Sequence, residues 1–155
     1  HYIATVHGAA SMFATAFVAV LDPSSGLLAY ANAGHDPPLL WRRDAPAPER
    51  LLPTGPALGV SATIRLALGQ DQLRPGDLLL AYTDGVTDAA GADGPFGEQR
   101  LLEAVGQCAG HWESLLAVVS GALEAHVTAD HRHDDITLLA VARRPAESAS
   151  SAALC

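Results

Sequence analysis

Apolar residues along this chain fall into short runs that are separated by turn-forming residues. The run over 13–21 predicts a buried strand, although periodicity alone leaves a helix open. Asp22-Pro23-Ser24-Ser25-Gly26 is a turn signal, because Pro sets φ and Gly tolerates positive φ. Residues 27–33 then predict the returning strand of a hairpin. Leu39-Leu40-Trp41 follows two prolines and predicts a short strand at a sheet edge.

The second half of the chain changes from strand to helix patterning. Alternating apolar residues predict a half-buried strand over 63–68, and the apolar run 78–82 predicts a central strand. Helical spacing predicts two amphipathic helices, over 101–108 and 112–127, before a last strand over 136–142. Strands followed by two helices and a strand indicate an α+β fold with an antiparallel sheet and segregated helices.

Composition narrows the class of protein. The 155 residues suit one domain, and 49% hydrophobic with 17% charged residues excludes intrinsic disorder. No apolar run approaches 18 residues, so we expect no membrane segment. The net charge of −8 argues against nucleic-acid binding; it suits a cation site and ordinary solubility equally well. The only cysteines, Cys108 and Cys155, form no disulfide framework, which predicts a cytoplasmic location.

Three carboxylates are candidates for chemistry. Asp84 comes where the central strand ends and is followed by Gly85, so it is held by a rigid element at an open rim; a plain Asp-Gly turn is the alternative. Asp134 and Asp135 precede the last strand. Adjacent carboxylates repel each other, and a hard divalent cation would hold them together; a solvated start of the strand is the alternative.

Histidines offer weaker candidates. His131-Arg132-His133 could suggest zinc, but the chain has no second Cys/His cluster at ligand spacing, so a solvated loop is favoured. His35, before Asp36-Pro37-Pro38, is either a ligand or proton carrier or a hydrogen-bonded histidine that shapes a tight loop. The nucleophile elbow G-x-S-x-G, the P-loop and G-x-G-x-x-G are all absent from the sequence.

Taken together, these segments resemble the SpoIIE-like branch of the metal-dependent (PPM, type 2C) serine/threonine protein phosphatases. The similarity runs from about residue 12 to residue 143 and rests on five stretches in the family's order. They are F-V-A-V-L-D-P-S-S-G-L-L-A-Y-A-N-A-G-H-D-P-P-L-L (17–40), L-P-T-G-P-A-L-G (52–59), L-R-P-G-D-L-L-L-A-Y-T-D-G-V-T-D-A (73–89), F-G-E-Q-R-L (96–101) and D-D-I-T-L-L (134–139). The family commonly has Asn at Asp36 and Glu at Asp88.

The resemblance implies the family's α-β-β-α sandwich, two antiparallel sheets flanked by helices. It implies two Mn²⁺ or Mg²⁺ ions, with Asp84 and Asp134 as metal ligands and a metal-bound water as the nucleophile on phosphoserine or phosphothreonine. Gly85 and Asp135 would lie just outside the ligands, and His35 on an active-site loop. The substrate would be a phosphorylated regulatory protein of the anti-sigma-factor-antagonist type, and a sensor domain would precede the phosphatase domain.

One departure from the family concerns the first metal motif, G-D-V-x-G-H-G, which is absent from the sequence. The chain therefore resembles the C-terminal part of the catalytic domain, truncated at the N-terminus. We expect residues 1–143 to form that portion and the Ala/Ser-rich residues 144–155 to form a flexible tail. The alternative function is a non-catalytic interaction or sensor-output module that keeps the fold without the full metal site.

Overall fold

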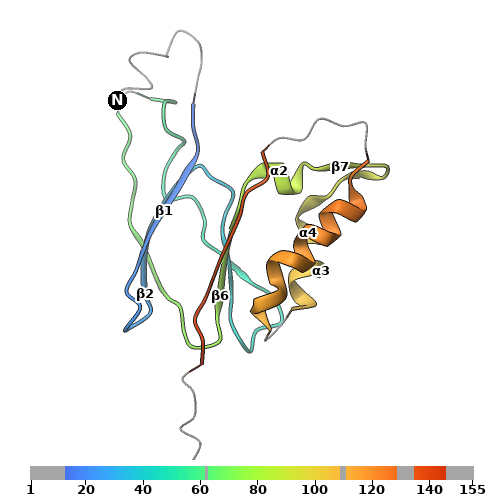
Figure 1. The fold of residues 1–155 in the computed structure, drawn as a ribbon. Helices are drawn as coiled ribbons and strands as arrows, with labels where there is room; N and C mark the ends of the chain where they lie inside the picture. Colours follow the sequence, from blue (N-terminus) through green and yellow to red (C-terminus); the bar gives the residue numbers. More distant parts are fainter. Residues whose placement is uncertain (1–12, 62, 109–110, 129–134, 146–155) are drawn as a thin grey trace, which may run out of the picture.

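Two antiparallel sheets and one layer of helices form the fold of this computed structural model (Figure 1). The structure describes residues 13–61, 63–108, 111–128 and 135–145. The first sheet has the order β1-β2-β5, and its strands are β1 (Ala16–Leu21), β2 (Leu27–Ala33) and β5 (Gly69–Gln72). The second has the order β4-β3-β6-β9, and its strands are β4 (Glu49–Arg50), β3 (Leu39–Trp41), β6 (Leu78–Tyr82) and β9 (Leu138–Ala142).

The helices lie on one side of the second sheet, away from the first sheet (Figure 1). They are α3 (Gly97–Gly106), the short 3₁₀ helix η2 (Trp112–Ser114) and α4 (Leu115–His126). A single turn, α2 (Asp84–Thr87), follows β6, and the small hairpin β7 (Ala90–Gly91) and β8 (Gly94–Pro95) leads into α3. The predicted α+β class with antiparallel sheets is confirmed. Within the described ranges, helices cover the second sheet alone.

Strand β6 contributes to two separate hydrophobic cores because its side chains alternate between the sheet's faces. Leu78, Leu80 and Tyr82 join the cluster under α3 and α4. Leu79 points the other way and joins Leu28 and other apolar residues between the two sheets. β6 lies between β3 and β9, so the predicted central strand is confirmed with the predicted bounds.

A polar network, formed by Arg42, Asp71 and Asp77, joins the two sheets beside β5. Arg42, just after β3, donates to Asp71 of β5 at 2.6 Å and to the buried Asp77 at 3.1 Å. Asp77 also accepts the backbone N–H groups of Arg43 and Arg74, each at 3.0 Å, so both oxygens of this buried carboxylate have hydrogen-bond donors. This polar network stabilises the turn that precedes β6.

Four strand predictions need correction, the fourth being that of the first strand, which is given with the hairpin below. Residues 63–68 form no strand where they are described; β5 comes after them, and its register is set by pairing with β2, which local alternation does not reveal. β3 is not an edge strand, because β4 pairs with its outer side and all three of its residues are buried. The last strand begins at Leu138, not Ile136, and is only half buried, because β9 is the end strand of its sheet among the described residues.

The hairpin of β1 and β2, with its turn at Asp22–Gly26, and the two helical regions are confirmed. The predicted buried strand over 13–21 is wrong in its start and its burial: β1 begins at Ala16 and none of its residues is buried, because no described helix covers the first sheet. Residues 1–12, 129–134 and most of the predicted tail lie outside the described residues, so Asp134 and the His131–His133 segment are not placed. In the described part of the chain, every helix is too short or too polar to cross a membrane.

Candidate functional site

Asp84 lies at the end of β6, as the first residue of α2. Its side chain is exposed, and its Oδ1 accepts the backbone N–H of Gly85 at 2.9 Å. Gly85 itself is buried. The end of a buried strand thus presents one carboxylate to solvent at the rim of the sheet.

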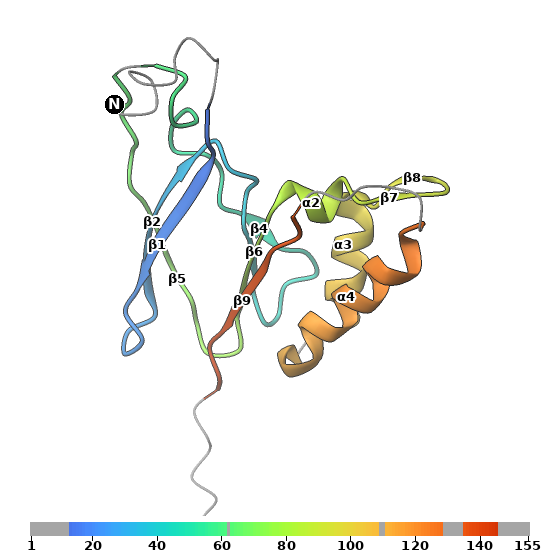
Figure 2. The same cartoon turned by 45° about the horizontal axis from the view of Figure 1, so that its top comes forward.

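Thr83 fastens the segment that precedes β9 to this rim. Its hydroxyl donates to the carbonyl oxygen of Asp135 at 3.0 Å and accepts the N–H of Thr137 at 3.0 Å. Its own N–H donates to the carbonyl of Thr137 at 3.1 Å. Figure 2 shows α2 at the end of β6, beside the start of β9. The backbone of Asp135 is therefore adjacent to the residue that precedes Asp84, and the side chain of Asp135 is exposed.

A second carboxylate, Asp36, reaches the same rim from the loop after β2. Its pKa is raised, first by burial and then by the negative charge of Asp84, with smaller contributions from Asp88 and Glu98. The neighbouring His35 opposes the rise. We call Asp36, Asp84, Asp88 and Glu98 the acidic rim. Sequence reasoning noted Asp36 only as a departure from the family pattern, and its approach to Asp84 is a long-range feature that no local signal reveals.

The loop that carries Asp36 is shaped by the fully buried Asn32. The Asn32 side chain accepts the N–H of His35 at 2.8 Å and donates to the carbonyl of Leu51 at 3.1 Å. Gly34 has φ +65° and lies against Ala57, so a side chain there would be strained. His35 Nδ1 lies 3.2 Å from the hydroxyl of Thr15. In the described residues, the contacts of His35 are thus those of a histidine that shapes a loop.

Positive charge at the rim comes from Arg50. It forms a two-pronged ion pair with Glu98, with both N–O distances 2.9 Å. This pairing raises the pKa of Arg50, and burial together with Glu98 and Asp36 raises the pKa of the nearby Tyr82 to about 12. Tyr82 is therefore a neutral phenol at physiological pH, and the net charge of the rim stays negative.

The donors at the rim suit a hard divalent cation in kind, because they are carboxylate oxygens. They fall short in number: among the residues that the structure describes, no three metal-ligating side chains converge. Asp84 and Asp36 are the two rim carboxylates with the strongest mutual electrostatic interaction, and the predicted ligand Asp134 is outside the described residues.

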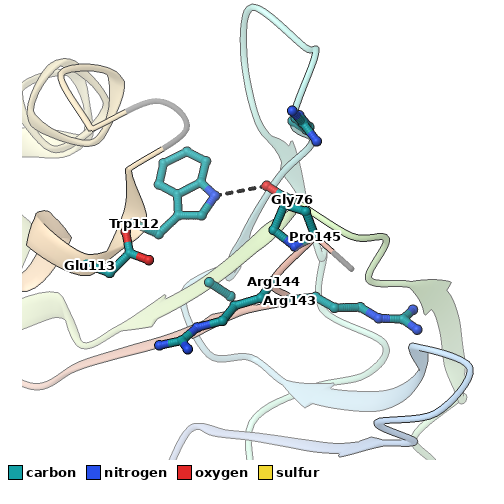
Figure 3. Close-up of a pocket in the computed structure, with 8 residues that line it drawn as sticks. Gly76, Trp112, Glu113, Arg143, Arg144 and Pro145 are labelled. Atoms are coloured by element: carbon teal, nitrogen blue, oxygen red, sulfur yellow. Dashed lines mark hydrogen bonds between the residues drawn. The ribbon is translucent and has the colours of Figure 1, made fainter. Parts of the chain in front are cut away.

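A cavity of about 310 Å³ lies at the opposite end of β6, where β9 ends. Its walls include Arg43, Gly76, Trp112 and Arg144, and Trp112 Nε1 donates to the carbonyl of Gly76 at 2.9 Å (Figure 3). Arg143 donates to the carbonyls of Ser24, Ser25 and Leu73. The cavity contains none of the predicted site residues, and its best-bonded arginine is already engaged in holding the strands together.

Known proteins resemble this chain over most of its length. The family model for Stage II sporulation protein E (SpoIIE) matches residues 2–144. Protein IcfG of Synechocystis sp. is 39% identical over 143 residues, which cover 92% of this chain and 22% of IcfG. The phosphoserine phosphatase RsbU of Bacillus subtilis is 27% identical over 87% of this chain and 40% of RsbU.

Among solved structures, the SiaA-PP2C domain of Pseudomonas aeruginosa matches with a TM-score of 0.66 and 25% identity, over 81% of this chain and 50% of that one. The chain thus spans less than half of the two curated relatives and half of the solved PP2C domain. The family model, the relatives and the sandwich of sheets all agree, and the chain belongs to the SpoIIE family of PP2C-type (PPM) phosphatase domains.

Proposed function

We propose that this chain is part of a metal-dependent protein phosphatase domain that hydrolyses phosphoserine or phosphothreonine on a regulatory protein. The observation that carries the proposal is the position of Asp84, an exposed carboxylate on the T-D-G stretch at the end of the central strand β6. The family membership supports the reaction, because RsbU is a phosphoserine phosphatase. The acidic rim supports the requirement for a cation, because it would repel a phosphate dianion without one.

The proposed metal ligands are Asp84 and Asp134, with Gly85 and Asp135 next to them. Asp36 joins them as a further proposed carboxylate, because the charge of Asp84 contributes to its raised pKa. When bound, Mn²⁺ or Mg²⁺ supplies a Lewis acid that neutralises phosphoryl charge and makes a water molecule more acidic. The chain's own residues orient the carboxylates: Gly85 holds one oxygen of Asp84, and Thr83 fixes the backbone beside Asp135.

The number of metal ligands distinguishes what the complete domain can bind from what this chain can bind alone. A pair of ions carries a charge of +4 and needs several anionic ligands to stay close, and the relatives contain at least as much polypeptide outside the match as inside it. We therefore propose that the complete site needs carboxylates from outside these 155 residues, and that this chain alone holds an ion only weakly. Its shortage of described donors favours the second candidate, a non-catalytic module that keeps the fold.

Three further proposals concern the substrate, the location and the boundaries. We propose a phosphorylated anti-sigma-factor-antagonist type of substrate, a sensor domain elsewhere in the parent protein, and a cytoplasmic location, which the free, buried thiol of Cys108 supports. We also keep residues 1–143 as the domain portion and 144–155 as its tail.

Mn²⁺ binding to the 155-residue chain tests the site directly. Titration calorimetry should detect weak binding that falls about tenfold or more in Asp84→Asn, since an amide oxygen is a poorer ligand for a hard cation. The matched control is Asp93→Asn, an exposed aspartate in the turn between β7 and β8, which should leave binding unchanged. Equal binding in all three proteins would contradict the metal site and favour the non-catalytic module.

A further inference from the structure

The cavity at the start of β6 collects positive charge in an otherwise acidic chain. Its volume is about 310 Å³, and its described lining includes Arg43, Arg143 and Arg144 against a single acidic residue, Glu113. The chain as a whole has a net charge of −8. Charges of opposite sign thus lie at the two ends of β6, with the acidic rim at Asp84 and an arginine-lined cavity at the other end.

Two of the three arginines have no anionic partner among the described residues. Arg143 donates to three backbone carbonyls and holds the strands together. The guanidinium groups of Arg43 and Arg144 have no hydrogen bond or ion pair to any described residue, although arginine stays charged at every physiological pH. Figure 3 shows the side chains of Arg143 and Arg144 extending in opposite directions. Arg43 and Arg144 are therefore available to an anion.

Gly76, in the turn before β6, fixes the walls of this cavity. Its N–H donates to the carbonyl of Arg143 at 2.6 Å, and its carbonyl accepts the indole N–H of Trp112 at 2.9 Å (Figure 3). Its φ is +95°, and an added Cβ would lie 2.6 Å from Cδ of Arg43, so the stem of that arginine lies directly against the glycine. Residues from three separate elements are thus held at one turn, and the cavity is formed before any ligand binds.

We propose that this cavity binds a small phosphate monoester that carries an aromatic ring, namely a nucleoside monophosphate. The planar fork of arginine matches two phosphate oxygens at once, and two unpaired arginines match the charge of a dianion. Trp112 supplies a flat apolar wall for the ring, and its indole is held in place by Trp41, with ring centroids 6.4 Å apart. The volume lies at the lower end of the range for small-molecule pockets, roughly 300–1,000 Å³, which suits a single nucleotide.

The proposed nucleotide site is separate from the acidic rim. The five residues of β6 lie between the two, and they span roughly 16 Å at the usual rise of a strand. The ligand is therefore not the substrate of the proposed hydrolysis. This inference goes beyond the proposed function and holds whether or not the rim binds a metal ion.

Calorimetric titration with AMP tests the site in buffer that contains EDTA, so that no metal ion can attract phosphate to the rim. The titration uses the 155-residue chain and the longer polypeptide that contains it and the rest of its phosphatase domain. In both, we expect AMP to bind at least about tenfold more tightly than adenosine, which lacks the phosphate, and than inorganic phosphate, which lacks the ring. This comparison of ligands needs no variant.

Substitutions locate the binding. Arg43→Ala and Arg144→Ala should each weaken AMP binding about tenfold, because each removes a charge-assisted hydrogen bond to phosphate. Their melting temperatures should equal that of the wild type, since neither guanidinium group has a described partner to lose. The matched control is Arg65→Ala, an exposed arginine outside the cavity, which should leave the affinity unchanged. Glu113→Gln should strengthen binding about threefold, because it removes the one negative charge in the lining.

Two results would overturn the proposal. If Arg43→Ala and Arg144→Ala bind AMP as tightly as Arg65→Ala does, the nucleotide binds elsewhere or only through general attraction to the chain. If inorganic phosphate binds as tightly as AMP, the cavity holds an anion without recognising a ring, and it is not a nucleotide site.

Discussion

Asp36 illustrates how neighbours decide the ionisation of one residue. Burial and the charges of Asp84, Asp88 and Glu98 disfavour its charged form, so its pKa lies above the ordinary value of 3.8. Between pH 3.8 and that raised pKa, the folded chain binds more protons than the unfolded chain. Stability therefore falls as pH rises through this window, and the destabilisation persists at neutral pH.

The substitution Asp36→Asn removes this destabilisation while keeping the size of the side chain. In buffer with EDTA, we expect the variant to have a higher melting temperature than the wild type at pH 7, and the difference to vanish below about pH 4. Melting curves at a series of pH values check this. A variant that is less stable than the wild type by the same amount at every pH would show that the charge of Asp36 is not the cause.

At the scale of single elements, β6 has a different core on each of its faces. Leu79 is 7% exposed and lies between the sheets. Leu79→Asp should lower the free energy of unfolding by about 4 kcal/mol, because it removes apolar packing and buries an unpaired carboxylate. Urea unfolding measures the change. Leu116→Asp, on the exposed side of α4, should cost no more than about 1 kcal/mol; equal costs would mean that the strand is misplaced.

The turn before β6 depends on Asp77, which accepts the N–H groups of Arg43 and Arg74 and the guanidinium of Arg42. Asp77→Ala should lower the free energy of unfolding by about 3 kcal/mol, because two partly buried backbone donors and the guanidinium of Arg42 lose their buried acceptor. Asp93→Ala is the control and should change stability by less than about 0.5 kcal/mol. An Asp77→Ala variant as stable as that control would refute the claim that this polar network holds the two sheets together.

Across the whole molecule, the sequence pattern predicts the elements whose structure is determined by residues close in sequence. The apolar runs at β2 and β6 and the turn at Asp22–Gly26 were found with the right bounds, because each sits between turn-forming residues. β5 was missed: its sequence, GQDQ, has little strand propensity. Its pairing with β2 requires Gly69 under the ring of Tyr30, and the Arg42–Asp71 ion pair holds it to the second sheet.

The site could be predicted in part for the same reason. Asp84 stands out in the sequence because a strand ends there and glycine follows, and its placement at the rim agrees with that prediction. Asp36 does not stand out, because its approach to Asp84 depends on the loop that Asn32 shapes. The placement of Asp134 as a metal ligand remains a prediction, since it lies outside the described residues.

Hydrolysis of a phosphoserine peptide in millimolar Mn²⁺ tests the central claim most directly. The 155-residue chain should turn over slowly or not at all. The longer polypeptide with the rest of the domain should be active and should lose at least about 100-fold in kcat/KM as Asp84→Asn, with Asp93→Asn unchanged. Robust Mn²⁺-dependent turnover by the 155-residue chain that Asp84→Asn abolishes would contradict the need for outside carboxylates. Full activity of Asp84→Asn in the longer polypeptide would contradict the site itself.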